Sequence, residues 1–307
     1  RQAWSCGAGS GRQAVVNFLF GWANMNTLRI TVPKTNVVRA AVATALCVSA
    51  VACERNGNSS ATVTPALDLA RLRMVDLTHA YNAQTIYWPN SPTTFALESQ
   101  AKGPTPGGWF YSANRFSSPE HGGTHLDAPV HFSEQGQSSE QIPLSQLIAS
   151  AVVIDIQGKV AQAPDYLLTR DDVLAFEQTH GTIAAGSIVL LRTGWSSRWP
   201  DRKAYLGDDE PGRTDRLHFP SYGAEAARLL VEERQVAVLG ADVASIDGGQ
   251  SQDFQVHRIA AAKNVPGLEN LTNLDSLPPT GAFVLALPMK IEGGSGGPLR
   301  AVGLVPR

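Results

Sequence analysis

His121-Gly-Gly-Thr-His125-Leu-Asp127-Ala-Pro-Val-His131 is the stretch that decides how the most reactive side chains of this chain come together. Two histidines four residues apart would share one face of a helix, but the glycines between them and the following proline disfavour a helix. We therefore expect a turn and then an extended segment. Because side chains alternate along a strand, His125, Asp127 and His131 would point to one face. The glycines would let the backbone fold so that His121 joins them.

This segment predicts a metal site. Two imidazoles and one carboxylate, from His121, His125 and Asp127, form a ligand set that suits Zn²⁺ or Mn²⁺. Three protein ligands leave one position open for water, which is typical of a catalytic site. His131 is interpreted as a fourth ligand or as a proton carrier, because an imidazole titrates near neutrality. The competing interpretation is that these histidines are capping or core groups.

Composition narrows the function classes. The chain has 307 residues, is 43% hydrophobic and carries a formal net charge of −2, which is ordinary for a globular protein. Lys and Arg are scattered, so we expect no nucleic-acid partner. The cysteines are Cys6, Cys47 and Cys53, so the body of the chain has no cysteine nucleophile or thiolate ligand. A metal would have to be held by histidines and carboxylates.

The N-terminal region predicts export. We interpret residues 1–24 as an upstream non-native extension, because the first methionine is Met25. Residues 25–52 have the basic and then short apolar pattern of a signal peptide. Ala50-Val-Ala-Cys53 resembles the lipobox of bacterial lipoproteins, so we expect a lipid anchor at Cys53 and a periplasmic or membrane-anchored protein. Cleavage by the ordinary signal peptidase near Ala52 is the alternative. Residues 53–66 would be a tether and residues 67–307 a single domain.

The remaining pattern predicts a mixed α/β fold with few helices. Short apolar runs bounded by turn residues indicate buried strands at residues 151–156, 188–192, 236–240, 283–287 and 301–305. Helices are expected from Thr169 to about His180, from Ser221 to about Glu233, and around residues 257–263. Because strands outnumber helices and the two alternate only in part, a mixed sheet fits better than a regular doubly wound one.

Three further segments are candidates for function. Residues 242–257 and Glu269 hold a second group of carboxylates with His257, but spacing alone does not select among them. Gly293-Gly-Ser295-Gly-Gly297 fits the G-x-S-x-G nucleophile pattern, although a strand-like run rather than a helix follows it. We interpret it as a glycine loop near the site. The long polar segment 196–220 is either a lid, an oligomer contact or a plain surface loop.

Several stretches of the sequence resemble a known family. HGGTHLDAPVHF at residues 121–132 is similar to the signature of the metal-dependent cyclase family, which includes bacterial kynurenine formamidase and isatin hydrolase. Further stretches agree in the family's order and extend the resemblance from about Val75 to Arg307: Val75-Asp-Leu-Thr-His79, Tyr87-Trp-Pro89, Leu190-Leu-Arg-Thr-Gly-Trp195, Gly240-Ala-Asp-Val-Ala-Ser-Ile-Asp247 and Gly267-Leu-Glu-Asn-Leu271.

The resemblance implies a swivelling β/β/α fold, a homodimer or higher oligomer, and one or two Zn²⁺ or Mn²⁺ ions per subunit. It implies that His257 and Glu269 complete a two-metal site with the three ligands above. His131 matches the proton shuttle, and Trp88 resembles the substrate-contacting tryptophan, with a core aromatic as the alternative. The implied reaction is hydrolysis of a small aromatic amide or lactam by metal-activated water.

Two alternatives stay open. The export signal argues against formyl-kynurenine, which belongs to cytoplasmic tryptophan breakdown, and the second cluster is more similar to isatin hydrolases. A non-enzymatic hypothesis is a periplasmic metal- or ligand-binding lipoprotein. The vacant ligand position and His131 separate the hydrolase hypothesis from the binding-protein hypothesis, because a storage site needs neither.

Overall fold

The computed structural model describes residues 68–307. The interpretations of residues 1–24, 25–52, Cys53 and the tether up to residue 66 lie outside the described residues. Within the described part, no helix is long and apolar enough to cross a membrane.

One mixed sheet of eight strands organises residues 68–307, in the order β1-β12-β11-β5-β7-β9-β10-β4. The strands β5, β7, β9 and β10 run parallel, and the other neighbouring pairs are antiparallel. The start of β12 also pairs with β4, so the sheet closes on itself at one end. The strands are β1 Leu72–Asp76, β4 His125–Asp127, β5 Ile148–Asp155, β7 Ile188–Arg192, β9 Val238–Ala241, β10 Gly267–Glu269, β11 Ala282–Pro288 and β12 Gly296–Pro306.

Helices are short and few. Thr169 caps α3 by accepting a hydrogen bond from the backbone of Asp172, as the sequence predicted. The helices are α1 Leu144–Leu147, α2 Gln157–Val160, α3 Arg170–His180, α4 Arg202–Leu206, α5 Ala224–Arg228 with a π-helical continuation at Leu229–Glu233, and α6 Gln255–Ala261. Single 3-10 turns are η1 Leu69–Arg71, η2 Pro129–His131, η3 Ser139–Gln141, η4 Trp195–Arg198 and η6 Leu274–Ser276.

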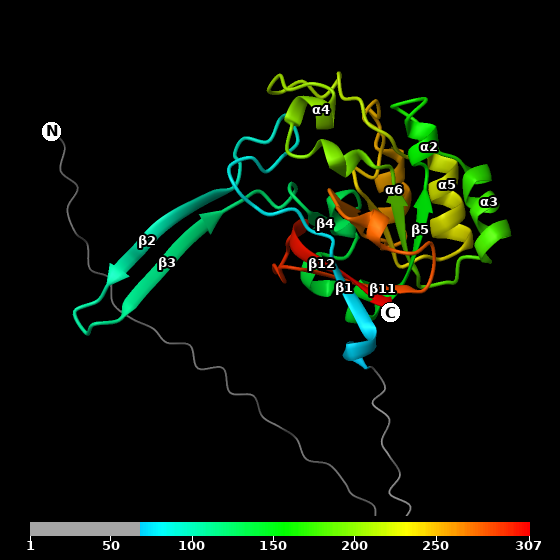
Figure 1. The fold of residues 1–307 in the computed structure, drawn as a ribbon. Helices are drawn as coiled ribbons and strands as arrows, with labels where there is room; N and C mark the ends of the chain where they lie inside the picture. The colour runs from blue at the N-terminus through cyan, green and yellow to red at the C-terminus, as the bar shows by residue number, and fades with distance from the viewer. Residues whose placement is uncertain (1–67) are drawn as a thin grey trace, which may run out of the picture. The chain divides into compact units, whose positions relative to one another are not determined.

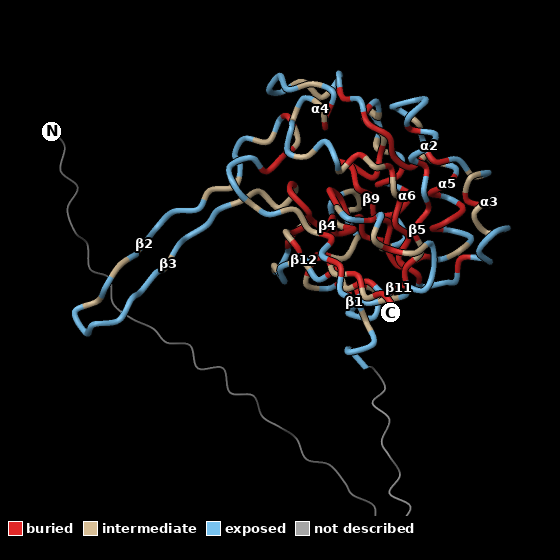
Figure 2. The backbone as a smooth tube through the Cα atoms, viewed as in Figure 1, coloured by how far each residue is buried: buried red, intermediate tan, exposed pale blue. Residues whose placement is uncertain are grey.

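Both faces of the central strands are buried, which explains why they read as continuous apolar runs. In β7, Val189 and Leu191 join a core with residues of α3, α5 and α6. The alternate residues, Ile188 and Leu190, join a second core with residues of β4, β10, β11 and β12. Figure 2 shows both cores as buried backbone at the centre of the body. The mixed α/β fold with few helices is confirmed.

Two local expectations are wrong. The predicted helix at Ser221 begins only at Ala224, because Ser221 and Tyr222 form β8 and pair with β6, Leu167–Leu168. The extended segment expected to run through His131 ends at Asp127. A 3-10 turn follows at Pro129–His131, since the fixed φ of proline suits the start of a helical turn.

A long β-hairpin projects from the body (Figure 1). It consists of β2, Ala96–Pro104, and β3, Phe110–Ser117, which pair with each other and with no further strand of the described chain. The hairpin was not predicted from the sequence, because its strands lack a regular alternation of apolar and polar residues. We refer to residues 96–117 as the arm.

Candidate metal centre

Strand β4 places the metal-binding signature at the closing seam of the sheet. His125 lies opposite Glu269 of β10, and Asp127 lies opposite Gly267. On the other side, β4 pairs with the start of β12, where Gly296 lies opposite Asp127. Because β4 is paired along both edges, the backbone that carries His125 and Asp127 is held from two directions.

The glycines before β4 make the turn that the sequence predicted. Gly123 has a φ of +61°, which favours glycine, and Gly122 has a φ of +150°. A Cβ atom on Gly122 would lie 2.1 Å from the ring of Tyr87. The backbone therefore folds tightly here and returns the His121 side chain to the face that carries Asp127.

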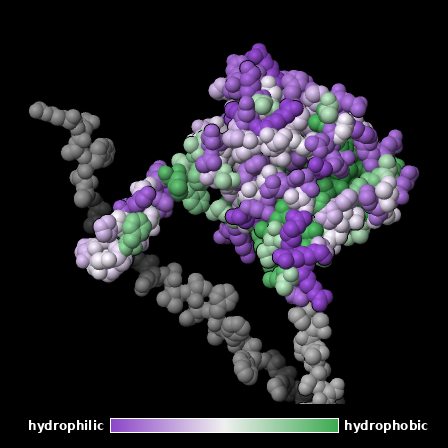
Figure 3. All heavy atoms as spheres, in the orientation of Figure 1, coloured by the Kyte–Doolittle hydropathy of each residue, from purple (hydrophilic) through white to green (hydrophobic). Residues whose placement is uncertain are grey.

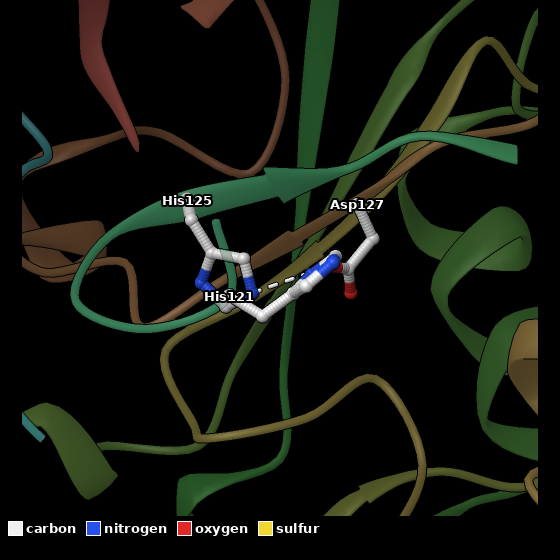
Figure 4. Close-up of side chains that lie close together, drawn as sticks. All are labelled: His121, His125 and Asp127. Carbon is white, nitrogen blue, oxygen red and sulfur yellow. Dashed lines mark hydrogen bonds and ion pairs between the residues drawn. The ribbon is translucent and has the colours of Figure 1, made fainter. Parts of the chain in front are cut away.

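His121, His125 and Asp127 converge as expected (Figure 4). His121 Nδ1 lies 2.5 Å and His125 Nε2 lies 3.1 Å from Asp127 Oδ1. A second triad of Asp127, His257 and Glu269 shares the same carboxylate. In it, His257 Nε2 lies 3.1 Å from Asp127 Oδ2 and 3.2 Å from Glu269 Oε1. In both triads, the candidate ligand atoms all lie within 4.8 Å of one another.

Hydrogen bonds on the outer side of two imidazoles fix which nitrogen faces the cluster. His125 Nδ1 donates to the carbonyl oxygen of Gly123 at 3.0 Å, because a carbonyl only accepts. His257 Nδ1 donates to Asp247 at 2.7 Å. The Nε2 atoms of His125 and His257 therefore face the carboxylates. This outer shell of acceptors is typical of metal-binding histidines.

Burial and opposite charge act against each other in the cluster. Burial would lower the pKa of His125, but the charges of Asp127 and Glu269 outweigh it and raise the pKa to about 9. Burial raises the pKa of Glu269, and the nearby Asp127 carboxylate raises it further. For Asp127, burial is outweighed by the charges of His125 and His121, which hold its pKa well below its usual range. The carboxylates thus require positive charge close by.

These residues fit a metal ion. Two carboxylates and three imidazoles converge in a site where His125, Asp127, His257 and Glu269 are all buried. Lone pairs of imidazoles facing carboxylate oxygens repel unless a proton or a cation lies between them. A nitrogen and oxygen ligand set of this kind suits a divalent transition metal. Because Asp127 belongs to both triads, the arrangement accommodates one ion or two.

A cavity of about 350 Å³ opens onto the cluster. Trp88 lines it and packs edge-on against Phe219 and at a tilt against Phe254, with ring centroids 6.3 Å apart in both pairs. Phe132 also lines it, and its ring centroid lies 5.4 Å from that of Phe254. The cavity wall is therefore aromatic, as a site for a planar apolar ligand requires.

His131 lies at the boundary between the cavity and the cluster. Its ring stacks on that of His121 with centroids 3.9 Å apart, and it remains exposed to the cavity. Partial burial lowers the pKa of His131 to about 4, although the charge of Asp127 opposes this change. The imidazole is therefore neutral at neutral pH and has a lone pair to accept a proton. The ring reaches this place from the η2 turn rather than from a strand.

Sequence reasoning missed Phe132 and Phe254 as cavity residues. Phe254 has φ +49° and ψ +48°, a left-handed conformation that is rare for a bulky residue and occurs most often at functional sites. No pattern in the sequence reveals such a backbone. Asp247, which the sequence left among several equivalent carboxylates, is selected by its bond to His257. The 196–220 segment contributes Leu206 to the cavity wall.

The chain is similar to known proteins in sequence and in structure. A family model described as a putative cyclase matches residues 75–248. An isatin hydrolase from Roseibium aggregatum is 38% identical over 208 residues, which cover 65% of this chain and 77% of that protein. A kynurenine formamidase from Salinibacter ruber is 27% identical over 233 residues, covering 75% and 97%. The structure of isatin hydrolase A from Ralstonia solanacearum matches with a TM-score of 0.71 at 39% identity, covering 77% of this chain and 93% of that one. The chain therefore belongs to the metal-dependent cyclase family.

Proposed function

We propose that this protein is a metal-dependent hydrolase of a small aromatic amide or lactam. The observation that carries the proposal is the aromatic cavity that opens directly onto the two triads around Asp127. A non-enzymatic binding protein needs no neutral imidazole between the ligand cavity and the metal cluster, where His131 lies. The names of the relatives, isatin hydrolase and kynurenine formamidase, agree with cleavage of an aryl amide.

His121, His125 and Asp127 would hold one ion, and His257 and Glu269 with Asp127 would complete a site for a second. A bound Zn²⁺ or Mn²⁺ supplies the acidity that ionises a water near neutral pH and polarises the carbonyl group. Trp88 and Phe254 would hold the aromatic ring of the substrate and keep bulk water from it. This orientation presents the amide carbonyl to the cluster.

His131 would move the proton. Its neutral ring accepts a proton from the attacking water and returns it to the amide nitrogen as the C–N bond breaks. Proton return matters because an aryl amine is weakly basic and leaves poorly without it. The stacking of His131 on His121 keeps the ring at the cavity edge throughout this exchange.

Among aromatic amides, a compact lactam such as isatin is the substrate we favour. The cavity volume of about 350 Å³ lies near the lower end of the range for small-molecule sites. The relative named isatin hydrolase is also more similar, at 38% identity, than the relative named kynurenine formamidase, at 27%.

The first prediction concerns metal binding. Zn²⁺ or Mn²⁺ should raise the melting temperature, since a ligand at 100 times its Kd stabilises the folded state by about 2.7 kcal/mol. The variant Asp127→Asn should lose this increase, because both triads share that carboxylate. Differential scanning fluorimetry with and without metal measures the effect. Asp275→Asn, at an exposed position, serves as control and should keep it. An unchanged increase in Asp127→Asn would place the metal elsewhere.

The second prediction tests the reaction. Metal-reconstituted protein should hydrolyse isatin, N-formylkynurenine or formanilide, and the His131→Ala variant should bind metal normally but lose about 10²–10⁴-fold in kcat. Absorbance assays with each substrate, in Zn²⁺ and in Mn²⁺, provide the comparison, and simple lactones complete the panel. His180→Ala, an exposed histidine on α3, should leave kcat unchanged. Inactivity toward every substrate with metal bound would favour the binding-protein hypothesis instead.

We also propose a homodimer formed through the arm. A two-stranded hairpin is marginally stable alone, yet this one exposes several large apolar side chains. Figure 3 shows apolar surface where the arm leaves the body and again along its length. A second copy of the chain, related by a two-fold axis, would cover the arms reciprocally. The exposed apolar residues of the arm are Leu97, Trp109, Phe110, Tyr111 and Phe116.

The third prediction follows from that proposal. Replacing both Trp109 and Phe110 with serine should convert a dimer to a monomer, because both side chains are more than half exposed in the isolated chain. Light scattering coupled to size-exclusion chromatography measures the mass. Leu144→Ser, which alters an equally exposed leucine outside the arm, is the control and should leave the dimer intact. A monomeric wild-type protein would reject the interface.

The fourth prediction concerns residues outside the described part. We propose from the sequence that the chain is exported and lipidated at Cys53. Expressed from Met25 in a bacterium, it should incorporate radiolabelled palmitate and sediment with membranes. Cys53→Ala should lose the label. Cys47→Ala is the control and should retain the label as wild type does. An unlabelled, periplasmic wild-type protein would indicate ordinary signal cleavage near Ala52.

A further inference from the structure

The glycine-rich segment Gly293–Gly297 plays no part in the reaction proposed above, yet its serine contacts the metal cluster. Ser295 Oγ lies 2.9 Å from His121 Nε2 and 2.5 Å from Glu120 Oε2. The Ser295 backbone N–H donates to the same carboxylate oxygen at 3.1 Å. Glu120, Ser295, His121 and Asp127 therefore form one continuous chain of polar contacts.

The direction of these hydrogen bonds follows from the groups involved. A carboxylate only accepts, so the Ser295 hydroxyl donates its proton to Glu120. The serine oxygen then accepts from Nε2–H of His121. Nδ1 of His121 faces Asp127 Oδ1 at 2.5 Å, a contact that needs a proton or a cation between the two atoms. Nδ1 is thus the nitrogen presented to a metal ion.

The glycine loop is shaped to hold both ends of this chain. A Cβ atom on Gly296 would lie 2.7 Å from the His121 ring, and one on Gly294 would lie 2.9 Å from Glu120 Oε1. Neither position has room for a side chain without displacing its neighbour. The repeated glycines thus let the loop close on the His121 ring and on the Glu120 carboxylate.

A serine-nucleophile interpretation must be weighed, because Ser295, His121 and Asp127 lie at the spacing of a nucleophile, a base and an orienting carboxylate. Three observations oppose it. The Ser295 hydroxyl proton is directed to Glu120 and away from His121. The residues that line the cavity do not include Ser295, so a substrate there would not reach its oxygen. The strand β12 also follows this serine, where a nucleophile elbow requires a helix.

We infer that Ser295 and Glu120 are positioning residues that hold His121 in its Nε2-protonated form and so set the affinity of the metal centre. Outer hydrogen-bond partners of this kind fix ring orientation and raise the basicity of the ligating nitrogen. The inference rests on the metal site proposed above. It assigns to the G-x-S-x-G segment a role in metal binding that does not involve attack on the substrate.

The test is the metal Kd, measured by competition with a chromophoric chelator for Zn²⁺ and for Mn²⁺. Ser295→Ala and Glu120→Ala should each weaken binding by about 10–100-fold. Because the two residues act in series, the double variant should bind no more weakly than Ser295→Ala alone. Saturating metal should restore hydrolysis by Ser295→Ala.

Two further variants separate this role from general support of the loop. Glu140 accepts a hydrogen bond from the Gly293 backbone N–H at 3.1 Å but contacts neither Ser295 nor His121. Glu140→Gln should therefore leave the metal Kd unchanged. Glu120→Gln keeps an acceptor for the serine hydroxyl and loses the charge, so its Kd should lie between those of wild type and Glu120→Ala. If circular dichroism shows that Ser295→Ala does not fold, the metal Kd of Glu120→Gln provides the test instead.

Each outcome decides between hypotheses. A metal Kd unchanged in the Ser295 and Glu120 variants would overturn the inference and leave the proposed function intact. Ser295→Ala that remains inactive at saturating metal, together with labelling of the wild-type protein by a fluorophosphonate, would establish Ser295 as a nucleophile. A wild-type protein that binds neither metal would instead overturn the proposed function itself.

Discussion

The buried carboxylate of Asp127 is the constraint on which the rest of the site depends. It is 4% exposed and accepts contacts from three imidazoles, His121, His125 and His257. An ionised group in such a place is costly unless opposite charge and hydrogen bonds compensate it. The three histidines come from a turn, from β4 and from α6. The need to compensate one charge therefore links segments that are up to 130 residues apart.

The fold meets this need by closing the sheet at β4. That strand has only three residues, but β10 and β12 pair with its two edges, so its position is fixed more firmly than its length suggests. The pairing with β10 places Glu269 opposite His125, and the pairing with β12 places Gly296 opposite Asp127. Closure therefore delivers a second carboxylate on one side and the glycine loop on the other. The apolar strands β5 and β7 contribute to the core against which this small seam packs.

The sequence pattern predicted the part of the site whose residues are close together in the chain. It did not predict the part that tertiary packing assembles. His125 and Asp127 lie two residues apart on a strand and so point to the same face. The glycines between His121 and His125 predicted the turn that returns His121 to that face. The place of His131 was right although its element was wrong, because the η2 turn at Pro129 directs the ring to the same side. His257 and Glu269 could not be chosen by spacing, since strand pairing and the packing of α6 bring them to Asp127. Only the family resemblance pointed to them.

Helix α6 connects the candidate metal ligands to the cavity wall through its first turn. Side chains such as Asp or Ser usually cap a helix, but Phe254 precedes α6 in a left-handed conformation that costs about 1–3 kcal/mol. Asp247 takes over the capping role, because its carboxylate accepts the backbone N–H groups of Val256 and His257 at 2.9 and 3.0 Å.

The same Asp247 carboxylate also accepts from His257 Nδ1. Asp247 thus caps the start of the helix and orients a candidate metal ligand. Position 254 is therefore free to carry an aromatic ring. The strain at Phe254 is offset by the cap and by contact with Trp88. The start of one short helix therefore places both an aromatic ring, Phe254, and a candidate metal ligand, His257, at the cavity.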